Sequence, residues 1–82
     1  MNTEVEVRTY ATFREYAPSN TPLGESFKVR VDKGTVRGVL EKLGIPFEPG
    51  IIVMVNGIRV TNLNHELKSG DLLAIFPQLG GG

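Results

Sequence analysis

Alternating apolar and polar residues mark two strands in the first third of the chain. The alternation has the two-residue period of a half-buried strand. The inward positions are Val5, Val7 and Thr9 in the first segment and Phe27, Val29 and Val31 in the second. Two neighbouring amphipathic strands predict an antiparallel pair. Between them, residues 11–17 favour a short helical turn that buries Phe13 and Tyr16 and ends at Pro18.

One amphipathic helix follows. Apolar residues spaced i, i+3, i+4 and i+7 form a stripe typical of a helix that packs on a core. These residues are Val36, Val39, Leu40 and Leu43. Thr35 suits the N-cap position, and Gly44 suits the position just after the last turn. Gly38 costs about 1 kcal/mol relative to Ala in a helix interior. Its presence indicates either a close approach of the helix to the sheet or simple tolerance.

Three further strands are predicted in the second half. Residues 51–55 are largely β-branched, Asn56-Gly57 suits a type I′ turn, and residues 58–60 return as a short strand. Residues 72–76 form a last apolar strand, and Pro77 stops further sheet pairing. This order predicts an α+β domain over residues 1–77, with a mixed sheet of about five strands curled around one helix.

Composition excludes several functional classes. The 82 residues fit one domain, and nine basic residues balance nine acidic ones, so no general field attracts nucleic acid or an anionic membrane. The chain has no cysteine, and its single histidine, His65, has no second imidazole to complete a metal site. The start of the chain has no signal-peptide pattern, and no segment is long enough to span a bilayer. We therefore expect a cytoplasmic protein with no metal site.

The most reactive stretch is the end of the chain, residues 78–82, with the sequence QLGGG. Successive glycines predict a thin, flexible tail that an active site can grip as extended backbone. The Gly82 carboxylate is then presentable as a substrate. Because a carboxylate is a poor acyl donor, a partner enzyme would have to activate it, for instance as an acyl-adenylate. Taken alone, the tail fits a frayed end or a linker equally well.

Four segments together carry a family resemblance. They are residues 7–15 (VRTYATFRE), 55–57 (VNG), 67–71 (LKSGD) and 76–82 (FPQLGGG). In this order they resemble the small sulfur-carrier proteins of the ubiquitin-like superfamily. The resemblance is closest to the small subunit of molybdopterin synthase, and less close to thiazole-synthesis carriers, which are usually shorter and lack the Phe13-Arg14-Glu15 turn. The chain departs from the pattern at Thr9, at Gln78, where a second proline is frequent, and at Gly80, which makes the usual glycine pair a triplet.

The resemblance implies a ubiquitin-like β-grasp fold whose first and last strands are central and parallel. It also implies that an E1-like enzyme adenylates Gly82 with ATP and that the adenylate is converted to a thiocarboxylate. Gly80 and Gly81 would thread a narrow channel. The thiocarboxylate would give its sulfur to a pterin precursor, in complex with a larger catalytic subunit, during molybdenum or tungsten cofactor assembly. The chain would be a protein co-substrate with no bound cofactor and no catalytic activity of its own.

The alternation also predicts a docking surface. If Leu73 and Ile75 face the helix, then Phe76 faces outward, and the same reasoning places Met54 outward in the middle strand. The two would form an apolar patch beside the root of the tail, and such a patch usually marks an interaction site. A register error of one residue would bury both instead. In the resembling family, Phe76 matches an aromatic residue that docks into the partner, and Met54 lies on the face that ubiquitin uses for recognition. Pro77 and Leu79 complete the predicted partner-binding set.

Three functional interpretations stay open from the sequence. The first is a sulfur carrier, for molybdopterin or for thiazole or another acceptor. The second is a ubiquitin-like modifier whose Gly82 becomes joined to lysines of target proteins. The third is a non-covalent β-grasp interaction module with an inert tail.

Overall fold

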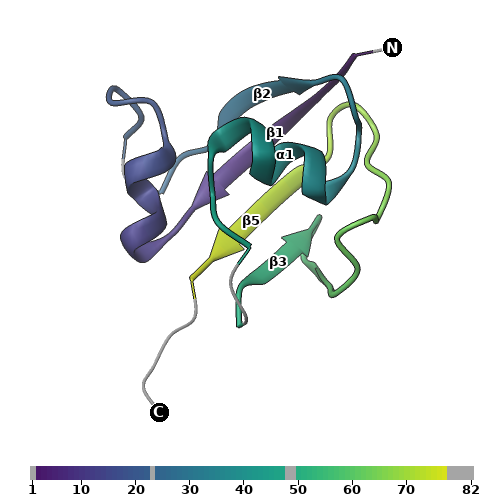
Figure 1. Cartoon of the computed structure of the whole chain (residues 1–82). Coiled ribbons are helices and arrows are strands. Elements are labelled where there is room, and N and C mark those ends of the chain that lie inside the picture. The colour runs from purple at the N-terminus through teal and green to yellow at the C-terminus, as the bar shows by residue number, and fades with distance from the viewer. Residues whose placement is uncertain (1, 23, 48–49, 78–82) are drawn as a thin grey trace.

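A five-stranded mixed sheet with one helix across one face forms the molecule (Figure 1). The structure is a computed structural model that describes residues 2–22, 24–47 and 50–77. The strands are β1 (Thr3–Thr9), β2 (Phe27–Val31), β3 (Ile52–Val55), β4 (Ile58–Val60) and β5 (Leu72–Phe76). A 3-10 helix, η1 (Ala11–Tyr16), follows β1, and the main helix, α1 (Val36–Leu43), lies between β2 and β3.

The first and last strands pair in parallel at the centre of the sheet. The strand order is β2-β1-β5-β3-β4, and all other pairs are antiparallel. In the parallel pair, Val7 lies opposite Leu73 and Thr9 opposite Ile75. The α+β class and the central parallel pair that the resemblance implied are therefore confirmed.

The core lies between the sheet and α1, and it uses the positions that the alternation predicts. The largest fully buried side chains come from β1, α1 and β5: Val5, Val7, Val36, Val39, Leu40, Leu73 and Ile75. Fully burying each such side chain contributes about 1.5–3 kcal/mol. Beside this core, η1 buries Phe13, whose ring meets the half-buried Tyr16 edge to face at a centroid distance of 5.7 Å.

The predicted caps and turns are present. The Thr35 hydroxyl accepts a hydrogen bond from the Gly38 N–H at 3.1 Å, which satisfies one of the unpaired donors at the start of α1. At the other end, Gly44 adopts a φ of +78°. Asn56 and Gly57 have φ values of +51° and +84°, as a type I′ turn requires.

The turn that leads into α1 explains Gly38, and the expectation of a close approach between the helix and the sheet is wrong. A Cβ at this position would lie closer than 3.0 Å to the Lys33 carbonyl oxygen and 3.2 Å from the Lys33 Cβ. Simple tolerance is equally wrong, because a side chain here would collide with backbone. The glycine lets the chain fold tightly over the first turn of the helix.

The segment between β4 and β5 has no regular structure, yet it packs against the start of α1. Leu67 is buried, and Leu63 is half-buried. The Leu63 carbonyl accepts a hydrogen bond from the Arg37 N–H at 2.8 Å, so this segment satisfies a further donor of the helix. Within residues 2–22, 24–47 and 50–77, no helix has the length and hydropathy needed to cross a membrane.

Candidate docking face beside the carboxyl terminus

The face of the sheet opposite α1 carries a band of half-buried apolar side chains. The pairing register brings the band together, because residues directly opposite on neighbouring strands point to the same face. Its members are Tyr10, Ile52, Met54, Leu72, Ala74 and Phe76, and all six are half-buried. We call this set the outer face. Its existence confirms the predicted register, since Val53, Val55, Leu73 and Ile75 are buried on the helix side.

Met54 and Phe76 are diagonal neighbours, not directly opposite each other. Met54 lies opposite Ala74, and Ile52 lies opposite Phe76. A diagonal pair across two strands is about 7–8 Å apart, and its Cβ atoms are somewhat closer, a distance that long side chains can still bridge. The predicted patch is therefore continuous, but it includes Ile52 and Ala74 as full members.

Tyr10 holds the Phe76 ring in place, a contact that sequence reasoning missed. The two rings are stacked, with centroids 4.4 Å apart and planes inclined by 8°. The Tyr10 N–H also donates to the Ile75 carbonyl at 3.2 Å. The only signal in the sequence was the alternation of side chains along the strand, which points Tyr10 outward because it directly follows the inward-facing Thr9. A second aromatic residue thus gives the end of β5 a defined shape.

Two arginines lie at the ends of one row of paired residues that crosses four strands of the sheet. Arg8 in β1 is opposite Ala74, Ala74 is opposite Met54, and Met54 is opposite Arg59 in β4. Arg8 is half-buried, and Arg59 is exposed on the edge strand, where it also borders a hollow on the helix side. No local pattern groups these two residues, because strand pairing alone brings them into one row.

A hydrogen-bonded network fixes the start of β5. The Asn56 side chain donates to Asp71 Oδ1 at 3.0 Å and accepts from the Leu72 N–H at 3.0 Å. The Lys68 N–H donates to Asp71 Oδ2 at 2.8 Å. The bond from the Lys68 backbone and then the bond from Asn56 lower the pKa of Asp71 below its usual 3.8. Asp71 therefore ties the start of β5 to the β3–β4 turn.

The chain leaves this face at the end of β5. Pro77 is buried, so its ring does not offer the open contact surface expected of a partner-binding residue. The other predicted tail residues, Leu79, Gly80, Gly81 and Gly82, lie outside the described residues. Among the predicted partner-binding residues that the structure describes, Phe76 is therefore the accessible one nearest to the end of the chain.

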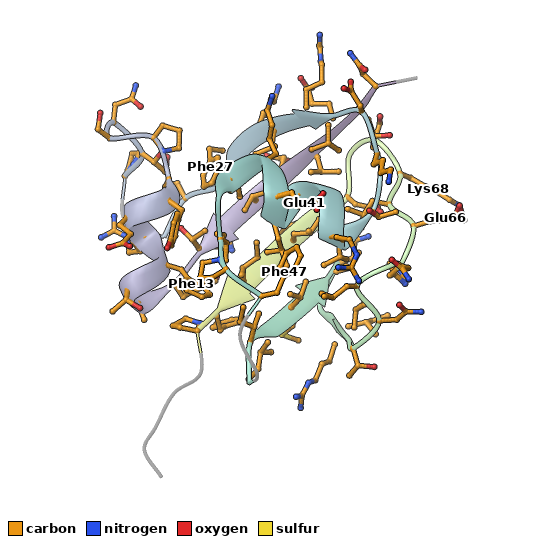
Figure 2. The ribbon with its side chains drawn as sticks, in the orientation of Figure 1. Phe13, Phe27, Glu41, Phe47, Glu66 and Lys68 are labelled. Carbon is orange, nitrogen blue, oxygen red and sulfur yellow. The ribbon has the colours of Figure 1, made fainter. Side chains whose placement is uncertain are left out.

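The helix side has a separate hollow of about 290 Å³. Phe47, 44% exposed, lies at its rim, and Figure 2 shows this ring beside α1. The Arg37 guanidinium carbon is 5.3 Å from the centroid of the Phe47 ring, within the range of a cation–π contact. None of the predicted site residues lies here. Among the described residues, no three His, Cys, Asp or Glu side chains group as a metal site, and His65 is exposed.

Comparison with known proteins decides the family. Residues 7–82 match the model of the ThiS family. The chain belongs to the ThiS family. The match covers the outer-face strands and continues through Gly82. No curated protein matches this ThiS-family chain.

Solved structures show the same fold over nearly the whole length. The Haloferax volcanii HVO 2177 protein is 29% identical, with a TM-score of 0.75 over 99% of this chain and 88% of its own. SAMP1 from Haloferax volcanii is 28% identical, with a TM-score of 0.66 over 96% and 99%. A protein complex of subunits 1 and 2 of molybdopterin-converting factor from Helicobacter pylori contains a chain 24% identical, with a TM-score of 0.59 over 98% and 100%. The ubiquitin-like sulfur-carrier fold that the sequence resembles is therefore the fold of this chain.

Proposed function

We propose that this protein is a sulfur carrier that is itself a substrate. An E1-like enzyme adenylates the Gly82 carboxylate with ATP, and the adenylate is converted to a thiocarboxylate that donates sulfur in molybdopterin biosynthesis. One observation carries the proposal: the family match continues from the central strands through Gly82. β5 leads directly from the middle of the sheet toward that end.

The chemistry follows from the electronics of a carboxylate. Its negative charge makes the carbonyl carbon a poor electrophile and leaves it without a good leaving group. Attack of a carboxylate oxygen on the α-phosphate of ATP forms the acyl-adenylate and releases pyrophosphate. Hydrosulfide then forms a C–S bond at the acyl carbon as the C–O bond to AMP breaks, which yields the thiocarboxylate and AMP. The chain supplies the acyl carbon, and the enzyme supplies the phosphate contacts and the sulfur. The lack of cysteine fits a carrier that holds sulfur on its own carboxyl end.

The folded domain would serve as the handle for both partners. Phe76 and Met54 on the outer face would contact the activating enzyme and then the larger catalytic subunit. Gly80 and Gly81 have no Cβ, so they would allow the tail into a narrow channel. The Helicobacter pylori complex joins two subunits of molybdopterin-converting factor, which supports a larger partner for this chain. The chain would act as a non-catalytic co-substrate, and we place the reaction in the cytoplasm, where ATP is supplied.

A second candidate is a protein modifier. In that case, a lysine amine of a target protein would attack the same Gly82 adenylate and form an isopeptide bond. The similarity to SAMP1 favours it, since another solved structure bears the name small archaeal modifier protein 1. Both functions share the adenylation step, so the fate of the adenylate separates them.

Intact mass spectrometry of the protein purified from its native host tests these proposals. A mass gain equal to the exchange of one oxygen for sulfur supports the carrier, and ladders of larger conjugates support the modifier. Deleting Gly81 and Gly82 should abolish either product and leave the far-UV circular dichroism spectrum unchanged. Phe47→Ala, on the helix side, is the matched control and should keep the product. An unmodified wild-type chain in a host with an active pathway would leave only a non-covalent interaction module.

A further inference from the structure

Asn56 is the one asparagine in the sequence that a glycine follows. The two residues form the β3–β4 turn, and both are exposed. A Cβ built at Gly57 would meet nothing within 4 Å, so water reaches this side of the turn freely. Because Gly57 has no side chain, its backbone nitrogen can approach the Asn56 side chain without steric hindrance. Asparagine is among the thermolabile residues, and this setting exposes it to attack by the backbone of the next residue.

The reaction is a cyclisation that needs only water. Hydroxide removes the proton of the Gly57 N–H, and the nitrogen attacks the side-chain carbon Cγ of Asn56. A C–N bond forms, the bond between Cγ and Nδ2 breaks, and Nδ2 takes a proton from water and leaves as ammonia. Water then opens the five-membered imide at one of its two carbonyls. Opening at the side-chain carbonyl gives aspartate, and opening at the backbone carbonyl gives isoaspartate, in which the main chain runs through the side chain.

The fold holds the Asn56 amide away from this path. Its Nδ2 donates to Asp71 Oδ1 at 3.0 Å, and its Oδ1 accepts from the Leu72 N–H at 3.0 Å. The Asn56 N–H donates to the Leu72 carbonyl at 2.8 Å. Both side-chain bonds have to open before Cγ can turn onto the Gly57 nitrogen. Hydrogen bonds also lower the pKa of Asp71, so at neutral pH its carboxylate accepts from Nδ2 but has no proton to give to the leaving ammonia.

We propose that Asn56 is a site of self-modification, at which the Gly57 nitrogen converts the asparagine to aspartate or isoaspartate, and that the bonds to Asp71 and Leu72 suppress this reaction in the folded protein. The evidence is the Asn-Gly sequence in an open turn together with the two bonds that hold the amide. The proposal does not depend on any reaction at Gly82.

The product would remove the contacts that hold the reaction back. A carboxylate at position 56 has no N–H for Asp71, and it places two like charges at hydrogen-bond distance. Isoaspartate adds a methylene to the main chain of a two-residue turn, so β3 and β4 would lose their register at this end. The modification would therefore release the start of β5 from the β3–β4 turn.

Timed incubation of the full chain, followed by peptide mass spectrometry, measures the reaction at Asn56. Conversion replaces an amide by a carboxylate, which the peptide mass detects, and the added negative charge allows separation by ion exchange. The folded wild type should react several-fold more slowly than the wild type in urea above its unfolding transition. Asp71→Ala removes the acceptor of Nδ2, and it should raise the rate in buffer about tenfold. In urea, its rate should equal that of the wild type, because no network remains there.

Thr35→Ala is the matched control for lost stability. It weakens the cap of α1 without removing a contact of Asn56, so it should raise the rate less than Asp71→Ala does. Asp71→Asn keeps an acceptor oxygen without the charge. It should give an intermediate rate, and it provides the comparison if thermal unfolding shows that Asp71→Ala is not folded. Asn64, which is exposed and followed by His65, is the internal control in every sample and should stay unmodified.

Three results would overturn the inference. One is a rate at Asn56 in the folded wild type equal to the rate in urea. Another is equal acceleration by Thr35→Ala and Asp71→Ala, which would assign the protection to the fold as a whole. The third is an Asn56 that reacts no faster than Asn64 in urea.

Melting temperatures measure the consequence for the fold. Asn56→Asp, which reproduces one product, should melt below the wild type. Adding Asp71→Asn should recover part of the loss, because an amide then faces a carboxylate again. An Asn56→Asp protein as stable as the wild type would refute the release of β5. None of these assays reads the chemistry of Gly82, so their failure would leave the proposed function intact.

Discussion

Replacing Gly38 by Ala changes the stability of the fold in two opposite ways. Helix propensity alone favours Ala by about 1 kcal/mol in a helix interior. The new Cβ, however, would lie closer than 3.0 Å to the Lys33 carbonyl oxygen. That oxygen belongs to backbone and cannot turn aside as the end of a flexible side chain could. The substitution therefore requires the turn at residues 33–35 to move.

The turn is held at several points, which makes the movement costly. The Lys33 carbonyl accepts from the Thr35 N–H at 2.8 Å, and the Gly34 carbonyl accepts from the Leu67 N–H at 2.7 Å. Thr35 also caps the helix through Gly38 itself. Overpacking costs about 1–3 kcal/mol, and a weakened cap adds about 1 kcal/mol. After the gain in propensity, we expect Gly38→Ala to destabilise the fold by about 2 kcal/mol. For a domain of this size that lowers the melting temperature by roughly 8–16 °C.

Urea and thermal unfolding followed by circular dichroism measure this effect. Glu41→Ala is the control, because Glu41 is an exposed residue of the same helix, labelled in Figure 2, and should change stability by less than about 0.5 kcal/mol. A Gly38→Ala protein as stable as the wild type, or more stable, would refute the steric reasoning. It would mean that the turn relaxes freely and that propensity decides.

Three further changes follow from contacts of the caps, the network and the outer face. Thr35→Ala should cost about 1 kcal/mol in unfolding free energy, because the Gly38 N–H loses its acceptor. Hydrogen bonds in the folded protein lower the pKa of Asp71. Asp71 therefore stabilises the fold at pH values above its pKa in the unfolded chain, and this stabilisation is lost as the pH falls through its pKa in the folded protein. Urea unfolding between about pH 6 and pH 2 should therefore show a smaller acid loss for Asp71→Asn than for the wild type. Phe76→Ala should cost about 0.5–1.5 kcal/mol for the lost Tyr10 stack, beyond the loss of buried area, and should slow formation of the mass-shifted product.

Each of these has a contrary result. Thr35→Ser keeps a hydroxyl, so a loss of stability equal to that of Thr35→Ala would argue against capping. Identical acid profiles for Asp71→Asn and wild type would show that the Asn56 and Lys68 bonds do not favour the ionised carboxyl. Phe76→Leu keeps an apolar side chain without the stack, and a product rate equal to that of the wild type would show that the aromatic stack is not required.

Local pattern was sufficient to predict the elements and their buried sides. Leu73 and Ile75 alternate with outward residues because each strand residue turns the side chain to the other face, whatever the neighbouring strand is. Asn56-Gly57 predicts its own turn, since both positions need positive φ. The bounds of β5 and the cap of α1 are set by such short-range rules, and both are confirmed.

Contacts between distant segments could not be predicted from the sequence. The row from Arg8 to Arg59 depends on the register of four strands, and no local property of either residue encodes that register. The Tyr10 stack depends in the same way on the parallel pairing of β1 and β5, which came from the family resemblance. The burial of Pro77 and the lack of space for a Cβ at Gly38 also depend on the three-dimensional path of the backbone, which local sequence does not reveal.

The hydrogen-bonded pairing of β1 with β5 joins residues more than sixty positions apart in the chain. Contacts with so large a separation form late, since a long loop must close before they are gained. During synthesis, a growing chain that lacks residues 72–76 has no β5, so the β1–β2 pair and the β3–β4 pair remain unconnected. The outer face therefore forms only after the ribosome has made residues 72–76. Unfinished copies would lack the complete face that we propose for docking.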